Sequence, residues 1–246
     1  MITLYPAIDL KDGRAVRLVK GDFDQSMVFN EDPVAQARAF AEAGATSLHV
    51  VDLDGARTGE PVHAPVVAEI AAAFGGTVHF GGGLRSRAAI ETALAAGAER
   101  LVVGTAVVVD QELLRWAIDR LGDGLVIALD ARDGKVATHG WTQVSELEAE
   151  EVARDLVRTG VRHLLYTDID RDGMLDGPNL ASLRRVAKSA PPLTVIASGG
   201  VSSLDDIRRL RQLGIDNLRG VVVGRALYEG RFTISEALHE LQAANT

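Results

Sequence analysis

Residues 9–16 read Asp-Leu-Lys-Asp-Gly-Arg-Ala-Val, and a similar segment, Asp-Ala-Arg-Asp-Gly-Lys-Val-Ala, recurs at residues 130–137, 121 residues later. Two further segments recur in the same order at nearly the same separation. They are Gly82-Gly83 with Gly199-Gly200, and Val103-Gly104-Thr105-Ala106 with Val223-Gly224-Arg225-Ala226. Chance explains any one of these pairs but explains all three poorly. The sequence therefore predicts two similar halves.

Short β-branched segments alternate with longer amphipathic segments along the chain. Continuous apolar strands such as residues 125–129 are typical of a parallel sheet buried on both faces. Eight strands, each followed by a helix, predict an α/β fold: a single (β/α)8 TIM barrel built of two duplicated half-barrels. A doubly wound open sheet is the alternative, but it usually has fewer strands. The predicted strands are Thr3–Ile8, Ser47–Leu53, Thr77–Phe80, Arg100–Val103, Leu125–Leu129, His163–Thr167, Leu193–Ala197 and Gly220–Val223.

Several residues predict where helices begin and end. Pro33 suits the first turn of a helix that runs to Ala43 and ends at Gly44. Residues 86–96 and 205–213 form similar patterns, each followed by a glycine. Ser203 and Asp110 are predicted N-caps.

Composition limits the class of protein. The 246 residues are 47% hydrophobic, which suits one globular domain over residues 1–246. A net charge of −8 argues against a generally basic nucleic-acid surface. The absence of cysteine excludes disulfides and thiolate chemistry. With no signal-peptide pattern and no apolar run of ~20 residues, we expect a cytoplasmic monomer with no membrane partner.

Carboxylates follow several predicted strands, at the end where barrel active sites lie. Asp9 and Asp130 follow strands one and five, on opposite sides of a barrel mouth. A substrate across the mouth would meet one carboxylate as base and one as acid. Asp172, after strand six, suits a site or a turn equally. Asp12 and Asp133, each before a glycine, are more typical of turns.

Glycine-rich turns follow four of the predicted strands. Two follow strands three and four and two follow strands seven and eight, so the two pairs lie half a barrel apart. Such turns expose backbone N–H groups at a helix N-terminus and bind phosphate. The sequence thus predicts a small-molecule substrate with two phosphates. The candidate ligands are Gly82, Gly83, Gly104 and Thr105 in one half, and Gly199, Gly200, Gly224 and Arg225 in the other.

No metal and no cofactor are predicted. None of the six histidines has a familiar ligand spacing, and no Gly-x-Gly-x-x-Gly follows the first strand. Asp52 and Asp54 are candidate Mg²⁺ ligands, but such a pair at a strand end is more often part of a hydrogen-bond network.

The chain resembles the phosphoribosylformimino-5-aminoimidazole carboxamide ribotide isomerase family over residues 2–240. That family catalyses an Amadori rearrangement in histidine biosynthesis, converting a bis-phosphorylated aminoaldose to an aminoketose. The motifs that carry the resemblance are Pro6-Ala-Ile-Asp9-Leu, Val16-Arg17-Leu-Val-Lys-Gly21, His49-Val-Val-Asp-Leu-Asp-Gly55, Gly81-Gly-Gly83, Tyr166-Thr-Asp168, Asp172-Gly173, Gly177-Pro-Asn179, Ala197-Ser-Gly-Gly-Val-Ser-Ser203 and Val223-Gly-Arg-Ala-Leu-Tyr-Glu-Gly230.

The resemblance implies a role for each candidate residue. Asp9 would be the general base that removes the C2′ proton. Asp130 or Asp172 would be the general acid that opens the ribose ring. Thr167 would orient the intermediate, Arg17 would hold a ligand end, and Trp141 would stack on the aminoimidazole.

Three alternatives stay open. The cyclase subunit of imidazole glycerol phosphate synthase shares the half-barrel pattern but normally lacks the Asp-Leu-Asp-Gly and Gly-Trp segments. A bifunctional isomerase also acts on phosphoribosyl anthranilate, but it tends to have serine where this chain has Gly81. A non-catalytic phosphoribosyl-binding barrel would not need the acids at positions 9, 130 and 172.

After strand five, the chain departs from the family that it resembles. The usual Ala-Thr-Arg-Gly-Trp is here Ala137-Thr-His-Gly-Trp141, so His139 replaces an arginine near the substrate. Histidine would hold an anionic group only when protonated. Residues 21–32 and 134–145 are predicted to be long loops that move over the substrate.

Overall fold

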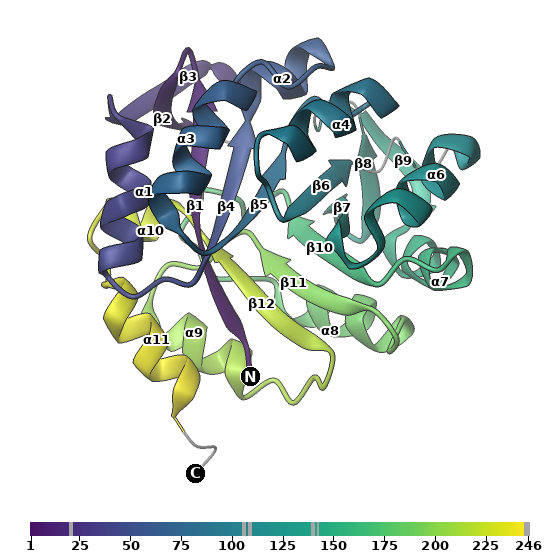
Figure 1. Cartoon of the computed structure of the whole chain (residues 1–246). Helices are drawn as coiled ribbons and strands as arrows, with labels where there is room; N and C mark the ends of the chain where they lie inside the picture. The colour runs from purple at the N-terminus through teal and green to yellow at the C-terminus, as the bar shows by residue number, and fades with distance from the viewer. Residues whose placement is uncertain (20–21, 105–106, 108–109, 139–140, 142, 244–246) are drawn as a thin grey trace.

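Eight parallel strands close into a barrel, with the order β1-β4-β5-β6-β7-β10-β11-β12 and back to β1 (Figure 1). The structure is a computed structural model that describes residues 1–19, 22–104, 107, 110–138, 141 and 143–243, without the side chains of residues 17–19 and 22–26. The barrel strands are β1 (Thr3–Lys11), β4 (Ser47–Asp52), β5 (Thr77–Gly81), β6 (Arg100–Gly104), β7 (Leu125–Arg132), β10 (His163–Asp168), β11 (Thr194–Ser198) and β12 (Leu218–Val223).

Helices surround the ring of strands (Figure 1). The eight that follow the barrel strands are α1 (Pro33–Glu42), α3 (Ala64–Phe74), α4 (Arg87–Ala95), α6 (Gln111–Leu121), α7 (Ala149–Thr159), α8 (Leu180–Ser189), α9 (Leu204–Arg211) and α11 (Ile234–Gln242). Shorter turns of helix are α2 (Leu53–Thr58), α10 (Arg225–Tyr228) and η1 (Gly122–Gly124). The predicted eight-stranded barrel is confirmed. Within the described residues, no helix is long and apolar enough to span a bilayer.

The predicted N-caps are confirmed. The Ser203 hydroxyl accepts from the backbone N–H of Asp206, whose carboxylate accepts from Ser203 in return. Asp110 accepts from the backbone N–H groups of Glu112 and Leu113. Pro33 opens α1. These caps satisfy donors that have no partner within the helix, which is why each helix begins at that residue.

Two antiparallel hairpins extend the barrel, which corrects the prediction of long loops after strands one and five. β1 continues into β2 (Arg14–Val19) and β3 (Asp22–Asn30), and β7 continues into β8 (Lys135–Thr138) and β9 (Gln143–Glu148). The predicted turns at Asp12 and Asp133 are confirmed, since φ is 50° at both and also positive at the following glycines. Two successive left-handed residues form a turn whose twist matches the paired strands, so strands follow where loops were expected.

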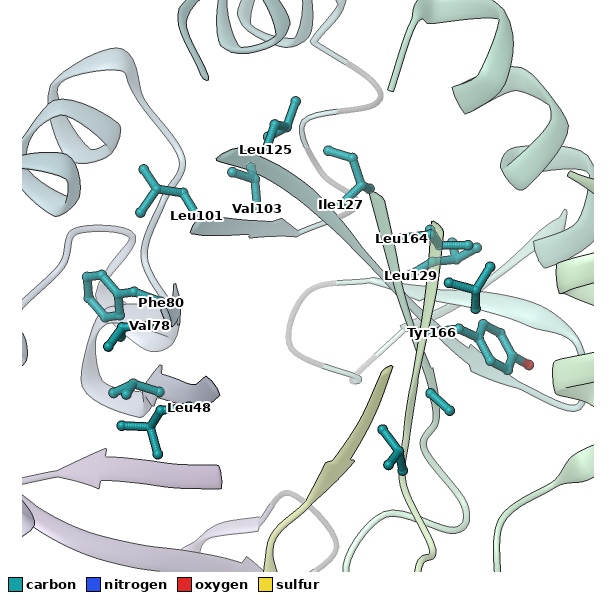
Figure 2. Close-up of a cluster of buried hydrophobic side chains, with 14 of the residues drawn as sticks. Leu48, Val78, Phe80, Leu101, Val103, Leu125, Ile127, Leu129, Leu164 and Tyr166 are labelled. Atoms are coloured by element: carbon teal, nitrogen blue, oxygen red, sulfur yellow. The ribbon is translucent and has the colours of Figure 1, made fainter. Parts of the chain in front are cut away.

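The main core lies between the strands and the helices. Figure 2 shows 14 of its side chains, among them Phe80, Leu101 and Ile127 on barrel strands, each fully buried. Burying one such side chain contributes roughly 1.5–3 kcal/mol. This outer layer of aliphatic and aromatic contacts therefore holds the ring of strands in place.

The inside of the barrel holds a smaller apolar cluster with polar groups beside it. Tyr5, Val126 and Leu165 belong to the cluster, and the buried His79 lies with its ring centroid 4.4 Å from that of Tyr5. Neither ring nitrogen of His79 has a hydrogen-bond partner among the described residues. Burial, together with the nearby His49, lowers the pKa of His79 to about 2. His79 is therefore neutral in the folded protein.

Candidate active site

Asp9, Asp130 and Thr167 face the inside of the barrel at its mouth, the end formed by the C-termini of the strands. Side chains alternate along a strand, and Tyr5 and Ala7 on β1 lie in the interior cluster, so Asp9 points inward as well. The same alternation on β7 and β10 places Asp130 and Thr167 inside. Three strands lie between β1 and β7 in each direction around the barrel. Asp9 and Asp130 therefore lie on opposite sides of the mouth.

Asp130 is held by two hydrogen bonds. The indole Nε1–H of Trp141 donates to Asp130 Oδ2 over 2.7 Å, and the side chain of Thr167 bonds to the same carboxyl group. Burial raises the pKa of Asp130 and the negative charge of Asp172 raises it further, while the two hydrogen bonds lower it. The net shift is upward, so Asp130 holds its proton to a higher pH than a solvated aspartate.

Asp172 lies in the segment between β10 and α8, close enough to Asp130 for their charges to interact. Its backbone N–H donates to the carbonyl of Asp168 over 3.1 Å. Gly199 supports this turn: a Cβ added there would lie 2.8 Å from Asp168 O and 3.5 Å from Asp172 N. The φ of Gly199 is +92°, which also favours glycine. The structure thus assembles Asp130, Trp141, Thr167 and Asp172 on one side of the mouth.

The glycines expected to bind phosphate also have a packing role. A Cβ at Gly82 would lie 2.1 Å from Asp52 O, and one at Gly83 would lie 2.6 Å from Glu60 O. In the other half, a Cβ at Gly200 would lie 2.5 Å from Gly177 O. These glycines let the loop after one strand pass directly over the loop after its neighbour. Phosphate binding at these turns stays a prediction.

Gly104 is more open than these glycines. No described atom lies within 4 Å of a Cβ added at Gly104, which is exposed. Gly224 precedes α10 without a side-chain cap. The side chain of Arg225 contacts protein, since its Nη1 donates to Gly173 O over 2.7 Å and its Nε donates to Glu229 Oε1 over 2.5 Å.

Asp52 and Asp54 form a hydrogen-bond network, as expected of such a pair. Asp52 accepts from the backbone N–H groups of Gly55 and His63, both over 2.7 Å. Asp54 accepts from the Asp12 N–H and contacts His63 Nε2, both over 2.8 Å. Burial works to raise the pKa of Asp54, but these two bonds lower it overall. Among the described residues, no group of three or more His, Asp or Glu side chains is arranged to bind a metal ion.

Sequence reasoning missed His63 and Asn179, which lie 116 residues apart at the starts of α3 and α8. Asn179 Nδ2 donates to Asp168 Oδ2 over 2.7 Å, much as the His63 N–H donates to Asp52. Both residues therefore tie the start of a helix to the acid that ends the preceding strand. The nearly constant separation of the other repeated segments was a signal that could have pointed to them.

Three predicted site residues are not fully described. Thr105 and His139 lie outside the described residues, and for Arg17 only the backbone is described, as part of β2 opposite Met27. Trp141 adopts φ of +73°, an uncommon conformation for a tryptophan. Its indole nevertheless reaches the mouth through the bond to Asp130.

Known proteins match the chain over nearly its full length. Residues 3–233 match the family described as "Histidine biosynthesis protein". Relatives from Sphingopyxis alaskensis, Roseiflexus castenholzii and Dinoroseobacter shibae are 48%, 47% and 50% identical, over 96–97% of this chain and 97–99% of theirs. Each is named as an isomerase of an imidazole-4-carboxamide that carries two 5-phosphoribosyl groups. The chain therefore belongs to the histidine biosynthesis protein family.

Proposed function

We propose that the chain is the isomerase of histidine biosynthesis that converts the bis-phosphorylated aminoaldose, the N′-(5′-phosphoribosyl)formimino derivative of aminoimidazole carboxamide ribonucleotide, to the aminoketose. Relatives with this activity in their names cover nearly the whole chain at 46–50% identity. The single structural observation that carries the proposal is the pair of carboxylates, Asp9 and Asp130, on opposite sides of one barrel mouth. An Amadori rearrangement needs a base and an acid that both reach the same sugar, and carboxylates on opposite sides of the mouth can do so.

The pair Asp130 and Asp172 supplies the proton in this proposal. It protonates the ring oxygen of the ribose as the C1′–O bond breaks, leaving a C1′–nitrogen double bond. Asp9 then removes the C2′ proton to give an enol-amine. The enol-amine takes a proton back at C1′ from Asp9 while its C2′ hydroxyl returns a proton to the ionised acid, which gives the C2′ ketone. The charge of Asp172 contributes to the raised pKa of Asp130, so we keep both carboxylates as candidates for the general acid.

The remaining candidates hold the substrate. One phosphate binds at Gly82, Gly83, Gly104 and Thr105, and the other at Gly199, Gly200, Gly224 and Arg225, with Arg17 at one end. Trp141 covers the aminoimidazole, which fits its contact with Asp130 at the mouth. Crystals grown with phosphate would test this directly. Phosphate density at both sites supports the binding of two phosphates, and density at only one site contradicts it.

The proposed reaction moves protons within one molecule, so it requires neither metal nor cofactor. We also propose one domain, a monomer and a cytoplasmic location, with no nucleic-acid or membrane partner. The domain proposal is supported by the family match over residues 3–233 and by the closed sheet. Mass measurement in solution tests the monomer.

The decisive experiment mixes the purified protein with the aminoaldose and follows the aminoketose by chromatography. Turnover that persists after exhaustive chelation supports the metal-free scheme. If chelator abolishes turnover and Mg²⁺ restores it, Asp52 and Asp54 become the candidate metal ligands. No turnover by a folded protein would favour the non-catalytic phosphoribosyl-binding barrel.

A further inference from the structure

Arg225 joins the last barrel turn to the segment that carries Asp172. Its Nη1 donates to the carbonyl oxygen of Gly173 over 2.7 Å, across 52 residues of sequence. Gly173 directly follows Asp172, so this bond holds the backbone next to a proposed proton donor. The pattern of glycine-rich turns that suggested Arg225 as a phosphate ligand gave no sign of this contact.

The guanidinium is fixed from a second side. Its Nε donates to Glu229 Oε1 over 2.5 Å, one helical turn further along, and this bond lowers the pKa of Glu229. Glu229 also accepts from Arg231 Nε over 3.4 Å. Glu229 is only 28% exposed, so its carboxylate is partly shielded from water. A planar guanidinium can bind a carboxylate at Nε and a carbonyl at Nη1 together, which a lysine ammonium reproduces poorly.

The segment around Asp172 needs such support because it has little regular structure. Gly173 and Leu175 both adopt positive φ, and no helix or strand includes residues 169–179. Near its ends the segment is tied to other parts of the chain by the Ile169 N–H to Ala131 O and the Gly177 N–H to Gly200 O. Local bonds join the N–H groups of Arg171 and Asp172 to Asp168 O and the N–H of Met174 to Arg171 O. The bond from Arg225 lies between the two outer ties in sequence and holds the residue next to Asp172.

We propose that Arg225 is a positioning residue: its side chain holds Asp172 in place, and its backbone belongs to the proposed phosphate turn. The inference rests on the proposed function. Binding of a phosphate at Gly224 and Arg225 thereby steadies the proton donor through one side chain. A misplacement of about 1 Å at a reacting group costs on the order of 10²-fold in rate, so loss of this bond reduces turnover rather than substrate binding.

The test compares Arg225→Met with Arg231→Met. Both remove an arginine that binds Glu229, but only the first removes the bond to Gly173. We expect Arg225→Met to lower kcat about 10- to 100-fold with little change in KM and to shift the pH profile of kcat. Arg231→Met should leave all three near wild type. Arg225→Lys should recover little of the loss.

Hydrogen exchange of a peptide covering residues 169–177 separates this inference from the proposed function, since it needs no substrate. Faster exchange in Arg225→Met than in Arg231→Met supports the positioning role even if the wild-type protein fails to turn over the aminoaldose. Unchanged exchange overturns the inference. A higher KM with unchanged kcat also overturns it and makes the Arg225 side chain a phosphate ligand.

Discussion

Trp141 donates its indole N–H to Asp130 over 2.7 Å, so the side chain proposed to cover the aminoimidazole also contacts a proposed proton donor. The bond favours the ionised form of Asp130 and so lowers its pKa against the opposing effect of burial. The hairpin that carries Trp141 and the proton donor are therefore coupled electrostatically as well as spatially.

Trp141→Phe keeps the ring and removes the donor. The pKa of Asp130 should rise, and the basic limb of the kcat–pH profile should move to higher pH because the donor stays protonated longer. Trp116→Phe is the control, since Trp116 contacts Arg87 through its ring. A basic limb that stays in place or moves to lower pH would count against Asp130 as part of the proton-donating pair.

Asp9→Asn should lower kcat by at least ~10²-fold, the lower end of general-base contributions, with nearly unchanged folding. Asp12→Asn serves as control, because Asn tolerates the left-handed turn and the Asp12 contact to Asp54 uses the backbone. Near wild-type turnover, or unfolding, in Asp9→Asn would make Asp9 structural. Asp130→Asn and Asp172→Asn in parallel identify the supporting member of the acid pair by its smaller loss.

Asp130→Asn should also change stability with pH. Because its pKa is raised in the folded protein, folding favours the protonated form, and that advantage is lost as pH rises from about 4 through the folded pKa. The variant has no such loss, so its free energy of unfolding relative to wild type should increase over the same range. Denaturant titrations at several pH values check this. A stability difference that is independent of pH would contradict the raised pKa.

Gly82→Ala and Gly104→Ala separate packing from phosphate binding. The first places a Cβ 2.1 Å from a backbone oxygen at φ of +108° and should cost roughly 2 kcal/mol or more. The second meets no described atom, so its melting temperature should stay near wild type. An increased KM of Gly104→Ala would then indicate weaker binding of the phosphate at this turn. Equal melting temperatures for the two variants would refute the packing explanation.

Gly81 bears on the second substrate, and we expect no turnover of phosphoribosyl anthranilate. A Cβ at Gly81 would lie 3.1 Å from both Cβ and O of Val102, so Gly81→Ser should destabilise by about 1–3 kcal/mol. Val102→Ala would keep both of these atoms, so the anthranilate assay uses the wild-type protein and, where a melting curve shows that it is folded, Gly81→Ser. Turnover by the wild-type protein would establish the bifunctional alternative.

The barrel could be predicted from the sequence because its signals are local. Apolar strands, caps such as Ser203 and the repeated segments each depend on neighbouring residues, and all eight strands were found. The hairpins were missed because an Asp-Gly pair is typical of many turns. Only the alternation of polar and apolar residues in the flanking segments distinguishes a hairpin from the other turns.

The candidate site was harder to predict because its contacts are long-range. The positions of Asp9 and Asp130 follow from strand ends, but the bond from Arg225 to Gly173 spans 52 residues and depends on how two loops meet. The contact of His63 with Asp54 could not be predicted either, because a histidine at a helix start has no fixed partner in the sequence. Spacing identifies which residues reach the mouth but not which of them touch.

His79 makes the stability of the barrel depend on pH under acidic conditions. Unfolded, its imidazole takes up a proton near pH ~6.5, whereas in the folded barrel it stays neutral far below that. The stability from this histidine is therefore fully present above about pH 6.5 and falls by about 1.4 kcal/mol for each pH unit below it. At pH 5.5 the free energy of unfolding is therefore lower by about 1.4 kcal/mol, and this holds for any pKa of folded His79 below 5.5. Acidification therefore weakens the whole barrel through a residue that lies apart from the carboxylates at the mouth.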